Sequence, residues 1–275
     1  MTIKQTIQEQ SQKLKEITHI PAKEVEILIG HLLNKNTIWL HLNYHQEFEQ
    51  QKELEKLIQK RATHYPLEYL IGKASFYGEI FYTKEGVLIP RPETELLVEH
   101  AITCLNNLPK KPKRVLEIGV GSGVISIMLA LLVENIEIVG IDINPIALQL
   151  AKENALKHNV LDKINFIQSD LFDNVVGDFD MVISNPPYIA NEYILPHNVK
   201  YEPHNALFAG EVGDELLKQI IVQTHQRNIP YLFCEMGYDQ KPSLSQFLKQ
   251  FSTNKVEFYK DYAQFDRGFW VEFNH

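Results

Sequence analysis

From Arg114 onward the chain alternates short apolar runs with amphipathic segments, and this alternation constrains the fold more than any other feature of the sequence. Repeated strand–helix units predict a mostly parallel sheet covered by helices on both faces. The candidate strands are 114–118, 136–142, 164–168, 179–184, 231–235, 256–259 and 269–273, with helices near 122–134, 144–158, 214–226 and 240–251. The last two strands have no helix between them, so we expect an antiparallel hairpin there. The sequence therefore predicts a doubly wound α/β fold with a seven-stranded sheet.

Residues 1–75 have a different pattern, in which apolar side chains recur at helical spacing. The run Val25, Leu28, Ile29, Leu32 and Leu33 marks one face of a helix. Weaker stripes lie on either side of it, at Ile3, Ile7, Leu14 and Ile17 and at Leu54, Leu57 and Ile58. We therefore expect residues 1–75 to form a small helical bundle.

A β-hairpin linker is expected at residues 76–90, between the bundle and a sheet domain at 91–275. Phe76–Tyr82 and Val87–Ile89 have the β-branched and aromatic composition of strands. Gly86 would lie in the turn between them. The chain thus divides into a helical part, a hairpin and an α/β domain.

The composition is that of an ordinary globular protein and argues against several classes. No apolar run approaches the roughly 20 residues of a membrane span, and the first residues lack the layout of a secretory signal. Cys104 and Cys234 are expected to be reduced packing residues, so we expect a cytoplasmic protein without membrane contact. The net charge of −8, from 27 Lys and Arg against 35 Asp and Glu, argues against stable nucleic-acid binding. The basic stretch 110–114 is expected to be an exposed linker, and no metal site is expected because His41 and His45 lack an evident third ligand.

A glycine-rich turn, Gly119-Val120-Gly121-Ser122-Gly123, connects the first strand of the predicted sheet to a helix. Glycines at such a position allow a tight turn and a close approach of the backbone to a ligand. The spacing is not that of a dinucleotide-binding loop. Ser122 is expected to cap the helix that follows. The turn alone favours ligand binding without identifying the ligand.

Two acidic residues at neighbouring strand ends narrow the choice of ligand. Asp142 closes the second strand, where a carboxylate accepts both hydroxyls of an unphosphorylated ribose. Asp170 follows the third strand, where it would accept from an adenine amino group with Leu171 against the ring, although a turn cap is the alternative. Ligands bind at the carboxyl ends of strands in open α/β sheets. Together these residues predict an adenosine pocket.

The tetrapeptide Asn185-Pro186-Pro187-Tyr188, which we call the ledge, follows the apolar run 179–184. Its two prolines stiffen the turn, its Asn supplies polar amide atoms and its Tyr supplies a flat ring. Such a ledge would hold a flat, weakly nucleophilic NH2 group, from an amide or from an exocyclic base amine, in one orientation. An ordinary turn after a strand is the alternative.

The order of these features resembles that of class I S-adenosylmethionine-dependent methyltransferases that methylate amino groups. Further residues narrow the resemblance to the HemK/PrmC family, the peptide chain release factor glutamine methyltransferases. These residues are Gly72, Phe76, Gly78, Phe81, the run Val87–Glu95, Glu202-Pro203, Ala206-Leu207, Gly210, Gly213, Glu235-Met236-Gly237, Asp261 and Asp266-Arg267. Glu117 and Val120 depart from the pattern, in which Asp and Thr are expected.

The resemblance implies a Rossmann-like methyltransferase fold, S-adenosyl-L-methionine as cofactor and class-1 peptide chain release factors as partners. The acceptor would be the side-chain amide nitrogen of the Gln in a Gly-Gly-Gln loop. Asn185 and the Pro186 carbonyl would accept its two N–H groups. Tyr188 would cover its flat face, and Pro187 would keep the turn rigid. Cofactor contacts would come from Gly119, Val120, Gly121, Ser122, Gly123, Asp142, Asp170, Leu171 and Asn185.

Three other functions remain open at this point. A ribosomal-protein glutamine methyltransferase shares the ledge and differs only in its protein substrate. A DNA adenine methyltransferase would hold a flipped base on the same ledge, although the acidic charge counts against it. A helical adaptor with a vestigial cofactor domain would bind cofactor without transferring a methyl group. Three roles also stay open, because Glu93 and Thr94 could contact the methionine end of the cofactor or cap a helix, and Glu202 could shape the substrate entrance.

Overall fold

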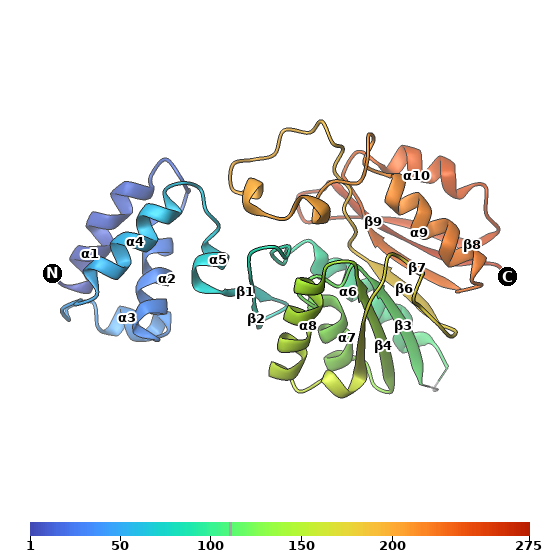
Figure 1. Cartoon of the computed structure of the whole chain (residues 1–275), viewed down its shortest axis with the longest axis horizontal. Coiled ribbons are helices and arrows are strands. Elements are labelled where there is room, and N and C mark those ends of the chain that lie inside the picture. The colour runs from blue at the N-terminus through green and yellow to red at the C-terminus, as the bar shows by residue number, and fades with distance from the viewer. Residues whose placement is uncertain (110–111) are drawn as a thin grey trace. The chain divides into compact units, whose positions relative to one another are not determined.

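The computed structural model describes residues 1–109 and 112–275 (Figure 1). The chain forms two compact units, one of Met1–Lys73 with Leu195–Tyr201 and one of Ala74–Ile194 with Glu202–His275. Of the basic stretch, Lys110 and Lys111 lie outside the described residues. No helix in the described part of the chain combines the length and the apolarity needed to cross a membrane.

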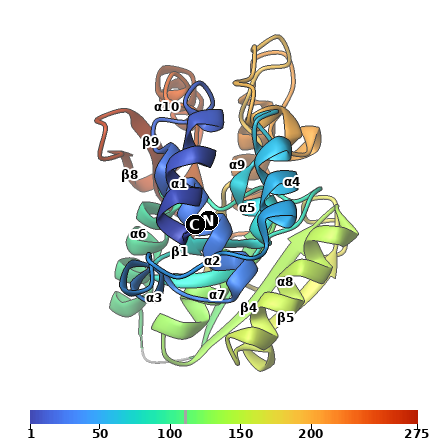
Figure 2. The same ribbon diagram turned by 90° about the vertical axis from the view of Figure 1, so that its left-hand side faces the viewer.

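The first unit is a helical bundle, as its apolar stripes predict. Its elements are α1 (Ile3–Ser11), η1 (Gln12–Leu14), α2 (Pro21–Leu33), α3 (Thr37–Leu42), α4 (Gln51–Arg61), α5 (Leu67–Ile71) and η3 (Val199–Tyr201). Figures 1 and 2 both show α1, α2 and α4 packed side by side. The core is built from the predicted stripes, with Val25, Leu28 and Leu54 fully buried. The sequence did not predict α3 and α5, because six and five residues are too few to establish a helical period.

A two-stranded sheet follows the last helix of the bundle. It consists of β1 (Lys73–Phe76) and β2 (Glu79–Tyr82). The two residues between them, Tyr77 and Gly78, have φ values of 54° and 80°. Positive φ at both central residues is what a tight two-residue hairpin turn needs. The hairpin therefore begins three residues earlier than predicted and ends at Tyr82.

The predicted second strand at Val87–Ile89 is wrong. Gly86 lies in a turn, with a φ of 87°, but the residues after it form no strand. Their apolar character reflects side-chain burial and not sheet pairing, since Val87 and Ile89 are both buried. The Ile89 N–H donates to the Glu202 carboxylate at 3.0 Å, so a side chain replaces a neighbouring strand as its acceptor.

The second unit is centred on a seven-stranded sheet, which confirms the predicted fold class. Its strands are β3 (Lys113–Ile118), β4 (Ile136–Asp142), β5 (Ile164–Gln168), β6 (Met181–Ser184), β7 (Tyr231–Glu235), β8 (Thr253–Lys260) and β9 (Asp266–Phe273). Their order is β5-β4-β3-β6-β7-β9-β8. Strands β3 to β7 are mutually parallel, and β9 pairs antiparallel with both β7 and β8. The terminal hairpin is therefore also confirmed.

Helices cover both faces of this sheet, each over its own apolar core (Figure 1). One face carries α6 (Thr94–Asn107), α7 (Val124–Leu132) and α8 (Pro145–Lys157), and the other carries α9 (Glu215–Gln226) and α10 (Lys241–Leu248). Two short 3-10 turns complete the unit, η2 (Leu161–Lys163) and η4 (His204–Ala206).

The register of the parallel strands brings their carboxyl ends to one edge of the sheet. Ile118 is level with Ile141 on β4 and with Ser184 on β6, and Ser184 is level with Cys234 on β7. The segments that follow these strands must therefore meet at that edge, as in other open α/β sheets. These segments contain nearly every residue that the sequence marks as functional.

Candidate active site

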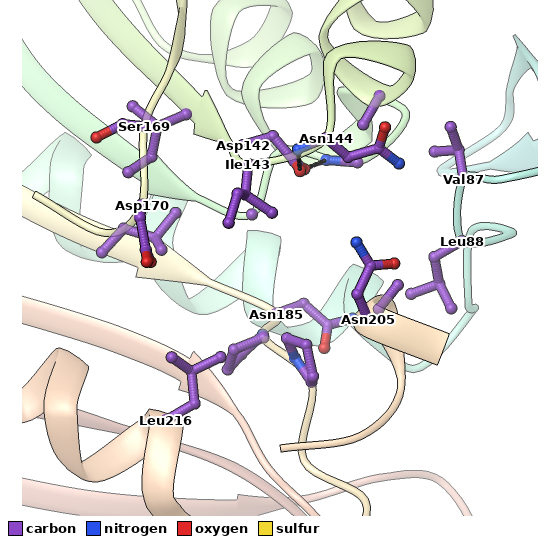
Figure 3. Close-up of a pocket in the computed structure, with 18 of the residues that line it drawn as sticks. Val87, Leu88, Asp142, Ile143, Asn144, Ser169, Asp170, Asn185, Asn205 and Leu216 are labelled. Atoms are coloured by element: carbon purple, nitrogen blue, oxygen red, sulfur yellow. Dashed lines mark hydrogen bonds between the residues drawn. The ribbon is translucent and has the colours of Figure 1, made fainter. Parts of the chain in front are cut away.

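A cavity opens at the carboxyl edge of the parallel strands and contains about 790 Å³ of space, part of it open to solvent. Figure 3 shows the cavity lined by segments that follow β4, β5 and β6, with the turn at 86–88 and Asn205 on a further side. Of the predicted site residues, it brings together Gly119, Gly121, Asp142, Asp170, Leu171, Asn185, Pro186 and Pro187.

A smaller cavity adjoins the first one and shares Gly119, Gly121 and Asn185 with it. Its lining also contains Val120 and Ser122 from the glycine turn, together with Thr94 at the start of α6. The two cavities together therefore reach most of the turn and the first three residues of the ledge.

The glycine turn has the open geometry that a closely approaching ligand needs. Gly119 and Gly121 have φ values of 74° and 54°, and a Cβ added to either would meet no heavy atom within 4 Å. Gly123 serves packing instead, because a Cβ there would lie 3.1 Å from the Ala151 Cβ. The expectation that Ser122 caps the helix is wrong, since α7 begins after Gly123, whose left-handed backbone occupies the N-cap.

Asp142 ties the glycine turn to the end of β4. One carboxylate oxygen accepts the Gly121 N–H at 2.9 Å, and the other accepts the Asn144 N–H at 2.9 Å. Burial raises the pKa of Asp142, and these backbone hydrogen bonds oppose that shift. The carboxylate keeps lone-pair capacity for a ligand hydroxyl.

The turn after β5 places Asp170 and Leu171 against the cavity. Leu171 has a φ of 43°, which is unusual for a branched side chain and typical of strained backbone at functional sites. Ser169 stabilises this conformation, because its hydroxyl donates to the Leu171 carbonyl and accepts the Asn174 N–H, both at 2.9 Å. Asp170 keeps an exposed side chain at the cavity.

The two ends of the ledge are held by a buried carboxylate on a different strand. Asn185 Nδ2 donates to Thr94 Oγ1 at 2.9 Å, and the Thr94 hydroxyl donates to Glu235 Oε2 at 2.6 Å. The Tyr188 hydroxyl donates to Glu235 Oε1 at 2.9 Å. Burial raises the pKa of Tyr188, with the charge of Glu235 as a further cause. Tyr188 is thus directed toward Glu235, and it is not among the described residues that line the cavities.

The first two residues of the ledge keep two hydrogen-bond acceptors available. In the described part of the chain, no donor contacts the Pro186 carbonyl oxygen or Asn185 Oδ1. The backbone on either side is fixed, because Ser184 Oγ donates to the Ile118 carbonyl at 2.7 Å and Gln240 Nε2 donates to the Tyr188 carbonyl at 2.8 Å. Two carbonyl oxygens on a rigid turn can receive the two N–H bonds of one NH2 group.

Glu117 lies beneath the glycine turn and is 1% exposed. It accepts hydrogen bonds from the backbone N–H of Ser126, at 2.9 Å, and from the Ser126 hydroxyl. Burial raises the pKa of Glu117 to about 8, although both bonds from Ser126 oppose the shift. This residue is a titratable group at the floor of the smaller cavity.

Four contacts that shape the site could not be predicted from the sequence. Asn144 Nδ2 donates to the Gly86 carbonyl at 2.8 Å and so joins the 86–88 turn to the cavity. Glu202 accepts from Arg91 Nη2 at 2.5 Å as well as from the Ile89 N–H, which makes it a clamp on the segment before α6. The Thr94–Glu235 contact joins positions 141 residues apart. Such pairings leave no periodic or local signal in one sequence.

Comparisons with known sequences give two family matches. Residues 5–72 match the PrmC N-terminal domain, and residues 94–200 match the Methyltransferase small domain. A protein named release factor glutamine methyltransferase from Clostridium botulinum is 36% identical over 254 residues, which covers 89% of each chain. One of the same name from Aquifex aeolicus is 34% identical over 262 residues, which covers 92% of each.

Solved structures share the fold at low sequence identity. The hMettl16 catalytic domain in complex with MAT2A 3'UTR hairpin 6 has a TM-score of 0.59 and 18% identity, covering 71% of this chain and 76% of that one. The N-terminal domain of human METTL16 in complex with SAH has a TM-score of 0.53 at 18% identity, with the same coverage. These likenesses concern the arrangement of the sheet and its helices.

Proposed function

The chain belongs to the HemK/PrmC family of release factor glutamine methyltransferases, and on that premise we propose the reaction that its ledge supports. A methyl group is transferred from S-adenosyl-L-methionine to the side-chain amide nitrogen of the Gln in the Gly-Gly-Gln motif of class-1 peptide chain release factors. The observation that carries the proposal is the pair of available acceptors, Asn185 Oδ1 and the Pro186 carbonyl, on a rigid turn beside the cavities.

The chemical difficulty is that an amide nitrogen is a poor nucleophile, because its lone pair is delocalised into its carbonyl group. Asn185 and Pro186 would accept the two N–H bonds and turn the nitrogen toward the electrophile. The same two dipoles would stabilise positive charge that develops on that nitrogen. The amide proton then leaves to water, so a strong base is not required. Positioning of this kind is worth on the order of 7–11 kcal/mol in well-oriented reactions.

The residues around the cavity fit the adenosine part of the cofactor. Asp142 has lone pairs for the two ribose hydroxyls, and Asp170 with Leu171 offers an acceptor and an apolar surface to adenine. Gly119 and Gly121 present backbone with open space in front of it, while Val120, Ser122 and Gly123 set the shape of the turn. When bound, S-adenosyl-L-methionine supplies an electrophilic methyl group on a sulfonium centre.

The acceptor subsite would lie on the ledge, in line with the open carbonyl oxygens. Pro187 keeps the turn stiff and lines the cavity with Pro186. That the Tyr188 ring covers the flat face of the acceptor amide stays a prediction. Its hydroxyl donates to Glu235.

The helical region is proposed to recognise the body of the protein substrate. The support is the match of residues 5–72 to a family domain that is distinct from the methyltransferase match. The proposed division is residues 1–75 for substrate recognition, 76–90 as a linker and 91–275 for methyl transfer. Release factors act in the cytoplasm, which is the compartment proposed for this enzyme.

The experiment offers labelled cofactor and several acceptors to the full chain. Recombinant release factor, the same factor with its loop Gln replaced by Ala, ribosomal protein and duplex DNA are compared under identical conditions. We expect label only in the unaltered release factor. Equal labelling of the Gln→Ala factor would reject the assigned acceptor, and label in ribosomal protein or DNA alone would favour one of the two alternative substrates.

A further inference from the structure

We infer that Thr94 and Glu235 are positioning residues that determine which end of the Asn185 amide faces the acceptor. This inference rests on the proposed function, because it explains how the ledge would obtain an oxygen at the required place. The three residues come from different elements, since Asn185 follows β6, Thr94 begins α6 and Glu235 ends β7.

The contacts form a continuous relay of hydrogen bonds. Asn185 Nδ2 lies 2.9 Å from Thr94 Oγ1, and Thr94 Oγ1 lies 2.6 Å from Glu235 Oε2. Thr94 and Glu235 are buried, with exposed fractions of 2% and 1%. The Thr94–Glu235 hydrogen bond is therefore shielded from water, which strengthens it and restricts the alternatives open to Thr94.

The direction of the relay follows from the number of protons available. Thr94 has a single hydroxyl proton, and it is donated to Glu235 Oε2. Thr94 then offers only lone pairs to Asn185, which must present its NH2 end. Asn185 Oδ1 is left on the other side, where it can accept an N–H from the acceptor amide. Without this constraint the two ends of an Asn amide are nearly equal in shape.

Tyr188 gives the same carboxylate a second donor and so extends the constraint along the ledge. Its hydroxyl contacts Glu235 Oε1 at 2.9 Å, while Thr94 contacts Oε2. Both carboxylate oxygens thus accept a hydrogen bond from a hydroxyl group, which is the arrangement that an ionised carboxylate favours. The first and last residues of the ledge are consequently fixed to one group.

A purely structural role would not explain the choice of Glu at this position. The residues on either side, Cys234 and Met236, are apolar and fully buried. Burying a carboxylate is costly, and apolar side chains of similar volume are often neutral or stabilising replacements. Burial raises the pKa of Glu235, while Thr94, Tyr188 and the charge of Arg267 oppose the shift. The buried Glu235 carboxylate thus lies where its contacts with Thr94 and Tyr188 can orient the ledge.

The first test compares Thr94→Val with Thr94→Ser in the full chain, using Thr103→Val as the matched control. Thr103 is exposed on the same helix and bonds only within it, to the Glu99 carbonyl. We expect Thr94→Val to lower kcat by roughly 5- to 100-fold, the range for a buried polar group that loses its partner. Thr94→Ser should restore kcat, and the KM for the acceptor and the affinity for cofactor should change little. A kcat for Thr94→Val equal to that of Thr103→Val would overturn the inference.

The second test replaces the carboxylate by an apolar group of similar length. Glu235→Met should keep or increase the resistance to urea but lower kcat to the same degree as Thr94→Val. If Thr94 and Glu235 act through one relay, the double variant should be no slower than the slower single variant. An unchanged kcat in Glu235→Met, or losses that multiply in the double variant, would contradict the relay.

A readout without catalysis separates this inference from the proposed function. The Asn185 side-chain NH2 signals can be identified in 15N spectra by their absence from Asn185→Ala. We expect these signals to shift and to exchange faster with water in Thr94→Val, and to stay in place in Thr94→Ser. Identical signals in Thr94→Val and wild type would overturn the relay. A wild-type protein that labels no release factor would reject the proposed function, yet the spectra would still decide on the relay.

Discussion

Gly121→Ala is expected to weaken cofactor binding far more than it weakens the fold. Gly121 has a φ of 54°, and a Cβ added there would enter space free of heavy atoms within 4 Å, beside both cavities. A left-handed backbone costs an L-residue about 1–2 kcal/mol. The smaller conformational freedom of alanine in the unfolded chain returns about 0.4–1 kcal/mol. The net loss of unfolding free energy should therefore be about 1 kcal/mol.

The matched control is Gly78→Ala in the turn between β1 and β2. Gly78 has a φ of 80°, and a Cβ there also meets no heavy atom within 4 Å, but this glycine lines neither cavity. Both variants should therefore lose a similar amount of stability. Only Gly121→Ala places a methyl group where the cofactor backbone contacts are proposed. We expect its affinity for S-adenosyl-L-methionine to fall at least tenfold, which corresponds to about 1.4 kcal/mol.

Isothermal titration with S-adenosyl-L-methionine measures the affinity, and urea unfolding of the same samples measures the stability. The predicted pattern is a similar shift of the urea midpoint in both variants and a loss of affinity in Gly121→Ala alone. If both variants bound the cofactor as tightly as wild type, the glycine turn would not be the cofactor cradle, and the assignment of the cavity would have to be abandoned.

The remaining predictions concern three carboxylates. Burial raises the pKa of Glu117 to about 8 from an ordinary value of 4.5, so between these pH values the folded state retains a proton that the unfolded state has lost. The free energy of unfolding should therefore fall by roughly 3 kcal/mol between pH 5 and pH 8, and urea titrations should find a smaller decline in Glu117→Gln. Parallel curves for the two proteins would argue against a protonated Glu117. In Asp142→Asn, the new NH2 group must face one of the two backbone N–H groups that the carboxylate now accepts, on Gly121 or Asn144. We expect the free energy of unfolding to fall by about 1–3 kcal/mol and titration to show weaker cofactor binding. Asp162→Asn is the exposed control. Glu202→Ala removes the acceptor of the Ile89 N–H and of Arg91. Its urea midpoint should fall by an amount equivalent to about 2 kcal/mol of unfolding free energy. A shift no larger than that of the exposed Glu211→Ala would rule out the clamp.

Much of the sheet could be predicted because its strands are continuous apolar runs between polar turns. The predicted bounds of β4, β5 and β7 agree with the structure at both ends. The run at 87–89 has the same composition, and the prediction failed because its burial comes from loop packing. A short apolar run does not distinguish these two environments.

The location of the site could also be predicted, because parallel strands end at one edge of the sheet. This rule brings the glycine turn, Asp142, Asp170 and Asn185 together without any knowledge of side-chain positions. The contacts that orient these residues could not be predicted in the same way. The Arg91–Glu202 and Thr94–Glu235 pairs join positions 111 and 141 residues apart, and their geometry depends on loop paths that no local rule fixes.

The most direct measurement of the central claim is the single-turnover rate of methyl transfer to a release factor by Asn185→Ala and by wild type, with cofactor at saturation. Removing one of the two oxygens proposed to hold the acceptor NH2 should slow this step by roughly 10²- to 10³-fold, as for other groups that stabilise a developing charge. A variant that methylates the Gly-Gly-Gln glutamine at the wild-type rate would contradict the role given to the ledge.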